Sequence, residues 1–271
     1  MKWGLVCKPS SDSFAVGEAI YKMLNGKGVF LEKKIAEHMG KRGYSLEELD
    51  SKADAMIVVG GDGTILTTLQ QTSKPIFSIN TGRIGFLTEV EKKDAGKAIQ
   101  KLLKGEYRVE ERLKLKGKLR KKRLPDAANE ITIHSASIGK ILPIKLYVDG
   151  ILTQSFLGDG LILATPMGST SYALSVGGPV VDPVLEVFIL APIAPFRHIA
   201  SALVIPADKT LKIKVEKPAI ISIDGIHTCD FKPSSTLSIS TSEKKARFIK
   251  LEDNFYRKIY RKLSFRYPRS L

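Results

Sequence analysis

The N-terminal part of the chain alternates between two patterns of apolar residues. Short apolar runs, typical of strands buried on both faces, occupy residues 3–8, 29–31, 55–59 and 76–79. Between them apolar residues recur with the spacing of one helix face, which predicts helices over residues 14–24, 34–39, 65–69 and 95–103. Strands that alternate with such helices are typical of an open parallel sheet. We therefore expect an α/β layer in this part of the chain.

The pattern changes near Tyr107. Leu113, Leu115 and Leu119 alternate with lysines, as in a strand with one buried and one solvated face. The same alternation returns over residues 144–148, 211–215 and 237–241, and turns rich in Gly, Pro and Asp separate these segments. This predicts a second, mostly antiparallel β domain.

A final helix is predicted near the end of the chain. The residues of its apolar face are Phe255, Tyr256, Ile259, Tyr260 and Leu263. A basic amphipathic helix can lie on a membrane, but its apolar face more often packs against a sheet. If the helix returns to the first domain, the β domain is an insertion. We thus predict an α/β fold in which residues 1–106 plus 246–271 form an open parallel-sheet domain, and residues 107–245 form an inserted β-rich domain.

Composition narrows the class of protein without identifying it. Of the 271 residues 43% are apolar, which is enough for a substantial core. The two cysteines, Cys7 and Cys229, form no disulfide framework or zinc-ligand pattern. The most apolar segment, residues 184–194, is interrupted by Glu186 and Pro192 and is too short to span a bilayer. Together with a start that lacks a leader pattern, these features predict a cytoplasmic location.

The formal net charge of +15 favours anionic partners. Because Lys and Arg are distributed along the whole chain, a solvated basic surface accounts for them better than a nucleic-acid-binding arm. The chain also lacks the stripe of aromatic and basic residues typical of RNA-binding sheets. We expect no nucleic-acid partner and no stable membrane association.

The segment from Gly60 to Thr64, with the sequence GGDGT, carries the strongest chemical signal. It follows the apolar run 55–59 and precedes a predicted helix, which places it at the carboxyl edge of the expected sheet. Its glycines let backbone N–H groups approach a phosphate, and a helix start adds partial positive charge. Asp62 would repel that phosphate unless it binds a metal ion or accepts a proton from an attacking hydroxyl. The alternative is an ordinary strand-to-helix turn.

A second glycine-bearing loop follows the next predicted strand. It contains Asn80-Thr81-Gly82 and Gly85-Phe86-Leu87, and should lie at the same edge of the sheet. Glu89, just after this loop, is expected to be a helix or surface charge.

Two segments of the β domain also carry polar groups. Asn129 shares a strand face with Ile131 and Ile133, so its amide needs a buried backbone partner or a ligand unless it lies at a surface edge. Residues 158–172, GDGLILATPMGSTSY, run from an apolar strand into a Gly-Ser-Thr turn that can begin a short helix. Hydroxyls followed by an aromatic residue suit a base that stacks and hydrogen-bonds, or a capped helix with a core tyrosine.

Taken together, these motifs resemble the NAD kinase family, whose members phosphorylate the adenosine 2′-hydroxyl of NAD to make NADP. The motifs appear in the family's order, and they are GGDGT at 60–64, NTG at 80–82 with GFL at 85–87, Asn129-Glu130, residues 158–172, and Gly177-Gly178-Pro179. GGDGT alone is also similar to lipid kinases and to a phosphofructokinase-type loop. The TPxGSTxY stretch is far more selective.

The resemblance implies roles for individual residues. Asp62 would be the catalytic base or a metal-linked carboxylate, with Gly61, Gly63 and Thr64 beside the reacting phosphates. The other residues implied to contact substrate are Asn80, Phe86, Leu87, Asn129, Glu130, Asp159, Thr170, Ser171, Tyr172, Ser175 and Asp224. Mg²⁺ or another divalent metal would be held mainly through substrate phosphates, with Asp62 as the one candidate side chain. NAD would be a substrate and not a redox cofactor, and a homodimer or homotetramer is implied.

Other interpretations stay open at this point. A lipid kinase acting on diacylglycerol or a sphingoid base shares the GGDGT loop, and the basic terminal helix would then contact membrane. Against it, Asn129-Glu130 and the Ser/Thr/Tyr stretch offer polar groups suited to a nucleoside. A nucleic-acid binder driven by net charge is a third class. The sequence does not decide between ATP, another nucleotide and polyphosphate as donor, or between NAD and NADH.

Overall fold

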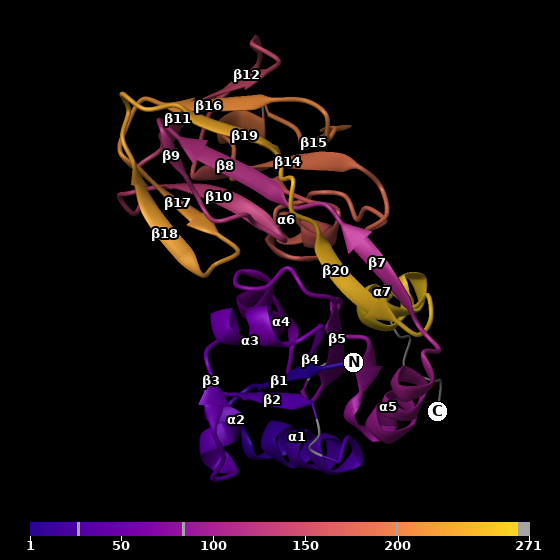
Figure 1. Ribbon diagram of the computed structural model, residues 1–271. Coiled ribbons are helices and arrows are strands. Elements are labelled where there is room, and N and C mark those ends of the chain that lie inside the picture. Colours follow the sequence, from indigo (N-terminus) through magenta and orange to yellow (C-terminus); the bar gives the residue numbers. More distant parts are fainter. Residues whose placement is uncertain (26–27, 83–84, 199, 265–271) are drawn as a thin grey trace. The chain divides into compact units, whose positions relative to one another are not determined.

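The computed structural model describes residues 1–25, 28–82, 85–198 and 200–264, and the chain divides into two compact units (Figure 1). The first unit contains Met1–Thr68, Lys74–Glu110 and the described residues from Arg247 onward. The second contains Leu69–Ser73 and Glu111–Ala246. The first has a mainly parallel sheet and the second antiparallel sheets, which confirms the predicted fold class.

The first unit is built on an eight-stranded sheet, counted over the described residues. Its strands are β1 (Trp3–Cys7), β2 (Val29–Glu32), β3 (Gly43–Tyr44), β4 (Ala55–Val59), β5 (Ile76–Asn80), β6 (Val90–Glu91), β7 (Arg108–Arg112) and β20 (Ala246–Lys250). They follow the order β3-β2-β1-β4-β5-β20-β7, and β6 pairs with β5. Because β4 and β5 are parallel neighbours, the loops that follow them lie at the same edge of the sheet.

Helices cover both faces of this sheet. They are α1 (Ser11–Met23), α2 (Lys33–His38), α3 (Leu46–Lys52), α4 (Asp62–Leu69), the 3₁₀ turn η1 (Lys92–Asp94), α5 (Ala95–Lys104) and α7 (Phe255–Leu263). Figure 1 shows α1 and α2 on one side of the strands and α3 and α4 on the other. Leu5, Ile57 and Phe77 form the core beneath α1 and α5. The predicted helices are present, whereas α3 was not predicted although Ser45 and Glu48 form its capping box.

The second unit contains two antiparallel sheets of six strands each within the described residues. One has the order β15-β14-β13-β10-β17-β18, and the other β12-β11-β16-β19-β8-β9. Their bounds are β8 (Leu115–Leu119), β9 (Lys122–Arg123), β10 (Glu130–Ser135), β11 (Leu142–Val148), β12 (Ile151–Gly158), β13 (Gly160–Ala164), β14 (Val187–Ile193), β15 (Leu203–Pro206), β16 (Leu211–Val215), β17 (Ala219–Ile223), β18 (His227–Phe231) and β19 (Leu237–Thr241). Short helical segments are η2 (Met167–Thr170), α6 (Tyr172–Ser175) and η3 (Phe196–His198).

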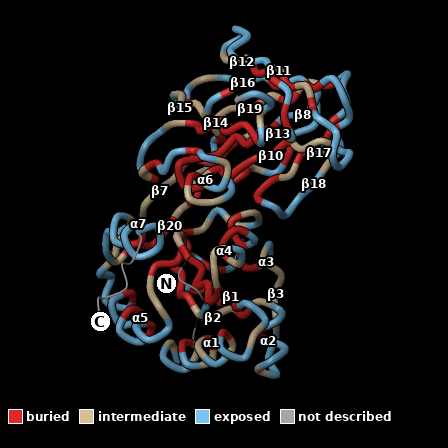
Figure 2. Tube along the Cα trace, turned by 180° about the vertical axis from the view of Figure 1, so that it is seen from behind, coloured by how far each residue is buried: buried red, intermediate tan, exposed pale blue. Residues whose placement is uncertain are grey.

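Alternate side chains of the two sheets meet in one core. Ile131 and Ile133 of β10 lie in the same cluster as Ile144 of β11 and Ile213 of β16. Figure 2 shows the buried residues concentrated along these strands, as the alternating apolar pattern predicts.

Two expectations about polar and apolar faces are wrong. In α7, Tyr256 and Tyr260 are 66% and 73% exposed, whereas Lys258 is buried. The side chain of Lys258 reaches the backbone carbonyls of Phe86 and Thr88, so its ammonium group is satisfied while its aliphatic stem is covered. Glu89 is not a surface charge: it is buried and pairs with Lys250. No helix in the described ranges combines the length and apolar character needed to cross a bilayer.

Candidate active site

The GGDGT segment forms the turn between β4 and α4. The N–H of Gly60 donates to the carbonyl of Ile79 at 2.9 Å, which continues the pairing with β5 beyond the strand end. The carbonyl of Gly61 accepts from the N–H of Thr64 at 3.0 Å and so begins α4. A Cβ atom at Gly61 or Gly63 would meet no other atom within 4 Å. The space beside these two glycines is therefore free of side chains, as expected for a turn that a phosphate can approach closely.

Asp62 joins this turn to the loop after β5. Its Oδ2 accepts the N–H of Phe86 at 2.9 Å, and its Oδ1 accepts the N–H of Leu87 at 3.1 Å. The residue is half-buried and does not point into the apolar interior. An ideal Cβ on Gly85 would lie 1.9 Å from Oδ1 of Asp62. The carboxylate thus occupies the space that any side chain at position 85 would need.

The predicted residues of the loop after β5 act mainly through its backbone. The side-chain amide of Asn80 bonds with both the N–H and the carbonyl of Gly82, which shapes the loop. Leu87 is buried, and the ammonium group of Lys262 lies 4.1 Å from the ring centroid of Phe86. Phe86 and Leu87 therefore orient Asp62 through their amides, whatever their side chains contact.

A cavity of about 230 Å³ lies beside the start of α4. Gly63, Thr64 and Thr67 line one wall, and Lys8 and Lys34 are among the residues that complete it. The lining also includes the carboxylate of Glu32, so two lysines against one acid beside a helix start leave a net positive charge that favours an anion.

In the second unit, Asp224 organises the segment before β10. Its Oδ1 accepts the N–H groups of Asn129 at 2.8 Å and Glu130 at 3.0 Å. Its Oδ2 accepts the N–H of Ala128 and the side-chain amide of Gln70, both at 2.8 Å. Burial nevertheless raises the pKa of this carboxyl. Both oxygens are engaged by protein donors, so the geometry favours a role in holding Asn129 and Glu130.

Asn129 and Glu130 are buried, which excludes the surface-edge interpretation of Asn129. Among the described residues, Asn129 Oδ1 and Glu130 Oε2 find no hydrogen-bond partner. The other oxygen of Glu130 accepts the hydroxyl of Ser171 at 3.3 Å. Burial, and then the neighbouring Asp224, raise the pKa of Glu130 to about 7. A buried acceptor pair of this kind indicates a site for hydroxyl or N–H donors.

The TPMGST turn packs directly against this pair. The hydroxyl of Thr165 donates to the carbonyl of Ala128 at 2.7 Å and accepts the N–H of Gly168 at 3.1 Å. A Cβ on Gly168 would lie 2.2 Å from the carbonyl oxygen of Asn129, so only glycine allows this approach. The turn is therefore folded around Asn129.

The remaining predicted residues lie near the same turn or at the surface. Tyr172 is 37% exposed and stacks on His134 with ring centroids 5.9 Å apart, so the core-tyrosine interpretation is wrong. The hydroxyl of Thr170 lies 3.5 Å from the carbonyl of Met167, while Ser175 and Asp159 are exposed. The sequence interpretation did not include Gln70 or His134 in the site, because no motif marks either residue.

Comparison with known proteins defines the class. Residues 11–107 match the family model of the ATP-NAD kinase N-terminal domain, and residues 128–251 match that of the ATP-NAD kinase C-terminal domain. The first match contains Asp62 and the loop after β5, and the second contains Asn129, Glu130, the TPMGST turn and Asp224. This class consists of phosphotransferases that act on an alcohol group.

Individual relatives cover nearly the whole chain. An NAD kinase from Methanoregula boonei is 40% identical over 242 residues, 88% of either chain. A solved NAD kinase from Archaeoglobus fulgidus, in complex with ATP, is 34% identical with a TM-score of 0.81, and the match covers 97% of this chain and 98% of that one. A yeast NADH kinase complexed with NADH shares the fold, with a TM-score of 0.90 at 22% identity and coverage of 99% and 90%. The chain belongs to the NAD kinase family and is an NAD kinase enzyme.

Proposed function

We propose that this enzyme phosphorylates the 2′-hydroxyl of the adenosine ribose of NAD to give NADP, with ATP or polyphosphate as donor. The observation that carries the proposal is the Asp62 carboxylate, which two backbone N–H groups orient and which lies between Gly61 and Gly63, two glycines with free space beside them. Family membership supplies the nucleotide acceptor.

Each unit carries its own candidate groups. In the β-rich unit, Asn129 Oδ1 and Glu130 Oε2 are acceptors for ribose hydroxyls, and their lack of protein partners in the described part of the chain supports this role. Thr170, Ser171, Tyr172, Ser175 and Asp159 are the candidates for contacts with a base or nucleoside. Tyr172 offers an exposed aromatic face for stacking. In the parallel-sheet unit, Gly61, Gly63 and Thr64 provide the phosphate site, and Asn80, Phe86 and Leu87 its second loop.

Asp62 accepts the proton of the attacking hydroxyl. Phosphoryl transfer passes through a loose transition state, so proton transfer is late and alignment matters more than basicity. The amides of Phe86 and Leu87 restrict the carboxylate to one orientation, which is the contribution that alignment requires.

The residues present fit a divalent metal bound with the substrate. Each oxygen of Asp62 accepts one N–H, which leaves lone pairs of a hard carboxylate ligand, and phosphate oxygens and water would supply the other ligands. When bound, such a metal would neutralise charge on the transferring phosphoryl group.

The cavity beside the start of α4 is our candidate for part of the donor site. Lys8, Lys34, Thr64 and Thr67 line it together with one carboxylate, Glu32. The ATP complex of the Archaeoglobus relative makes ATP the first donor to test. These groups recognise phosphate and not a particular base, which keeps polyphosphate as a second donor.

The lipid-kinase alternative is addressed by vesicle sedimentation. Tyr256, Tyr260 and Leu263 are exposed on α7, and a lipid kinase would use such a face to bind membranes. We expect the protein to stay in the supernatant with neutral vesicles. A cytoplasmic location, and the absence of a nucleic-acid partner, remain predictions of the same proposal.

We also propose a homodimer or homotetramer. Strand β12 is an edge strand of its sheet, and Ile151, Leu152 and Leu157 on it are 72%, 51% and 43% exposed. An exposed apolar edge strand pairs readily with a second copy of the chain.

The central experiment compares the wild type with Asp62→Asn. Purified protein receives NAD, Mg²⁺ and either ATP or polyphosphate, and NADP is followed with an NADP-specific dehydrogenase. We expect Asp62→Asn to lose turnover by about 100-fold or more while it keeps its fold and NAD affinity, because the amide cannot accept the proton. Near-wild-type turnover would remove Asp62 from the mechanism.

A further inference from the structure

We propose that Lys258 of α7 is a positioning residue for Asp62, and that it acts through the peptide group between Phe86 and Leu87. The inference rests on the proposed role of Asp62 and adds to it a residue that lies far away in the sequence. It concerns contacts within the parallel-sheet unit alone.

Two hydrogen bonds, joined by one peptide group, connect Lys258 to Asp62. The ammonium group of Lys258 donates to the carbonyl of Phe86 at 3.0 Å. That carbonyl belongs to the same peptide group as the N–H of Leu87, which donates to Asp62 Oδ1 at 3.1 Å. A cation on the carbonyl polarises the peptide and strengthens the bond that its N–H donates. Lys258 therefore acts on Asp62 across a single peptide unit.

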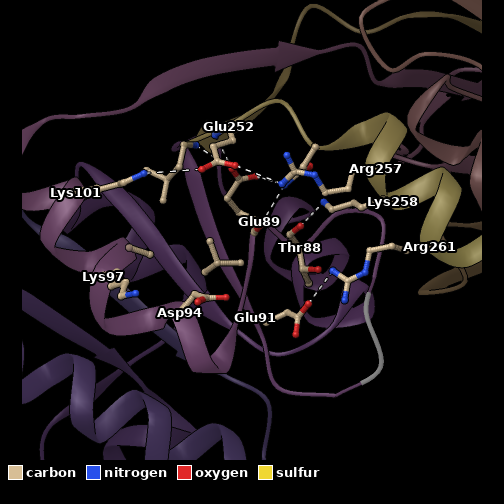
Figure 3. A pocket seen from close by; sticks show the side chains of 14 residues that line it. Thr88, Glu89, Glu91, Asp94, Lys97, Lys101, Glu252, Arg257, Lys258 and Arg261 are labelled. Atoms are coloured by element: carbon tan, nitrogen blue, oxygen red, sulfur yellow. Dashed lines mark hydrogen bonds and ion pairs between the residues drawn. The ribbon is translucent and has the colours of Figure 1, made fainter.

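The same ammonium group bonds with the carbonyls on both sides of Leu87. Lys258 also donates to the carbonyl of Thr88, as Figure 3 shows. Phe86 and Thr88 flank Leu87, so one cation fixes the carbonyls on either side of the residue whose N–H meets Asp62. The two bonds restrain the peptide group that carries that N–H, and Lys258 is 8% exposed.

Hydrogen bonds to Glu89 also hold the segment that leads into α7. Glu89 Oε1 accepts the N–H groups of Leu251 at 2.8 Å and Glu252 at 3.3 Å. The side-chain amide of Asn254, just before α7, donates to the carbonyl of Glu89 at 3.1 Å. Glu89 directly precedes β6, and its hydrogen bonds thus connect the segment before α7 to the start of β6. These bonds restrain the start of α7 and with it the position of Lys258 against the turn.

A mere packing role would not require a cation here. Replacing the ammonium group leaves the carbonyls of Phe86 and Thr88 without this donor in a largely buried place. The turn can then relax, and the amides that orient Asp62 move with it. An alignment error of about 1 Å lowers turnover by about 100-fold without a matching loss of substrate binding.

The test is a double-mutant cycle between Lys258→Met and Asp62→Asn. Methionine keeps an unbranched apolar stem and removes the charge. We expect Lys258→Met to lower kcat by about 10- to 100-fold and to leave KM for NAD and for ATP within about twofold. In the Asp62→Asn background the same change should lower residual kcat by less than about twofold, because Lys258 acts through Asp62. An NADP cycling assay has the sensitivity for the double variant.

Two further variants separate positioning from fold. Arg257→Met removes a cation from the same helix, where Arg257 and its partner Glu252 are 67% and 58% exposed, and it should leave kcat unchanged. Lys258→Arg retains a cationic donor and should recover part of the lost turnover. If Lys258→Met does not give folded protein by circular dichroism, Lys258→Gln, which keeps an amide donor, takes its place in the cycle.

The kcat values of these variants separate a failure of this inference from a failure of the proposed function. The inference is overturned if Lys258→Met keeps wild-type kcat while Asp62→Asn loses it, and the proposed function then stands. It is also overturned if Lys258→Met lowers kcat equally in both backgrounds, which would indicate a general structural effect. Wild-type turnover in Asp62→Asn would instead overturn the role of Asp62 and this inference with it.

Discussion

At the scale of single residues, the position of Asp62 depends on what is missing from Gly85. The hypothetical Cβ lies 1.9 Å from Asp62 Oδ1 and 2.5 Å from its Cγ. Backbone amides already hold the carboxylate, so Gly85→Ala forces either the turn or Asp62 to move. We expect kcat to fall by about 100-fold with a loss of stability of about 1–3 kcal/mol. Steady-state kinetics and urea unfolding measure the two effects separately.

The matched control is Gly96→Ala in α5. A Cβ there meets no atom within 4 Å, and alanine is the better helix former. This variant should keep full activity and unfold with a free energy equal to or about 0.5 kcal/mol above that of the wild type. Wild-type activity in Gly85→Ala would show that the observed orientation of Asp62 is not needed for turnover.

Glu130 links function to the pH dependence of stability. Its pKa is raised from the ordinary value of 4.5 to about 7, mainly by burial. Below about pH 4.5 the group is protonated in both folded and unfolded chains, and it then contributes no pH dependence. Between about pH 4.5 and pH 7 the unfolded chain releases this proton and the folded chain retains it, so the free energy of unfolding falls as pH rises. Above about pH 7 both states are ionised, and the loss of stability has reached its full value of about 3 kcal/mol.

We therefore expect Glu130→Gln to be more stable than the wild type at pH 8, by up to about 3 kcal/mol, and to show no such gain at pH 4.5. The same variant should bind NAD more weakly, because the carboxylate acceptor is lost. Urea unfolding at the two pH values and KM for NAD test both parts. Glu37→Gln, at an exposed position of α2, is the control. Equal stability changes at both pH values would contradict the prediction.

At this scale the sequence predicted where some of the polar groups lie, and it did not predict which groups they bond. GGDGT predicted a carboxylate at a sheet edge, because glycines and an acidic residue between a strand and a helix are typical of a turn that binds phosphate. The partners of that carboxylate are the backbone N–H groups of Phe86 and Leu87. Nearly every residue type has such an N–H group, so the identity of these two residues does not predict the bonds. Gln70 and Asp224 meet across 154 positions, so no local pattern relates them.

At the scale of elements, the buried pair of Glu89 and Lys250 joins the end of the β5–β6 connection to β20. Their side chains are 3% and 7% exposed. Lys250→Met leaves the carboxylate with backbone and amide donors but no counter-charge. Removing one partner of a buried ion pair costs about 3–5 kcal/mol. We expect the first unit to be destabilised by about 3 kcal/mol, as measured by thermal unfolding.

A surface ion pair in the same unit provides the control. Lys92 and Asp12 are 52% and 61% exposed at 2.8 Å, and exposed pairs contribute less than about 1 kcal/mol. Lys92→Met should therefore unfold within about 1 kcal/mol of the wild type. A similar loss in both variants would mean that burial of the Glu89 pair adds no stability.

Elements with one strong period were the most predictable. Ala55–Val59 and Leu211–Val215 form strands over the predicted ranges. A continuous apolar run is buried on both faces of a sheet, and an alternating run is buried on one face. The orientation of α7 was predicted wrongly, because its aromatic residues suggested the buried face. The structure instead buries Lys258, since two carbonyls provide partners for its charge. Periodicity cannot register such partners because they come from another part of the chain.

At the scale of the whole molecule, the chain splits into two units, each with its own core. The change of period near Tyr107 was the basis for our prediction of a separate β-rich domain. It gave no sign that Leu69–Ser73 belongs with the second unit. That assignment depends on contacts such as the one from Lys114 to the carbonyl of Leu69 at 2.9 Å, which joins residues 45 positions apart.

The net charge of +15 makes self-association unfavourable unless apolar contact offsets the repulsion. Edge strand β12 offers such contact through Leu152 and Leu157, both more than 40% exposed. The double change Leu152→Lys and Leu157→Lys adds two charges to this edge and should convert the proposed oligomer to a monomer in light scattering. Val204→Lys, on edge strand β15 of the other sheet, introduces one such charge at a residue that is 49% exposed and should leave the oligomer intact. Dissociation by Val204→Lys alone would place the contact on β15, because a charge disrupts association only where the two copies bury it.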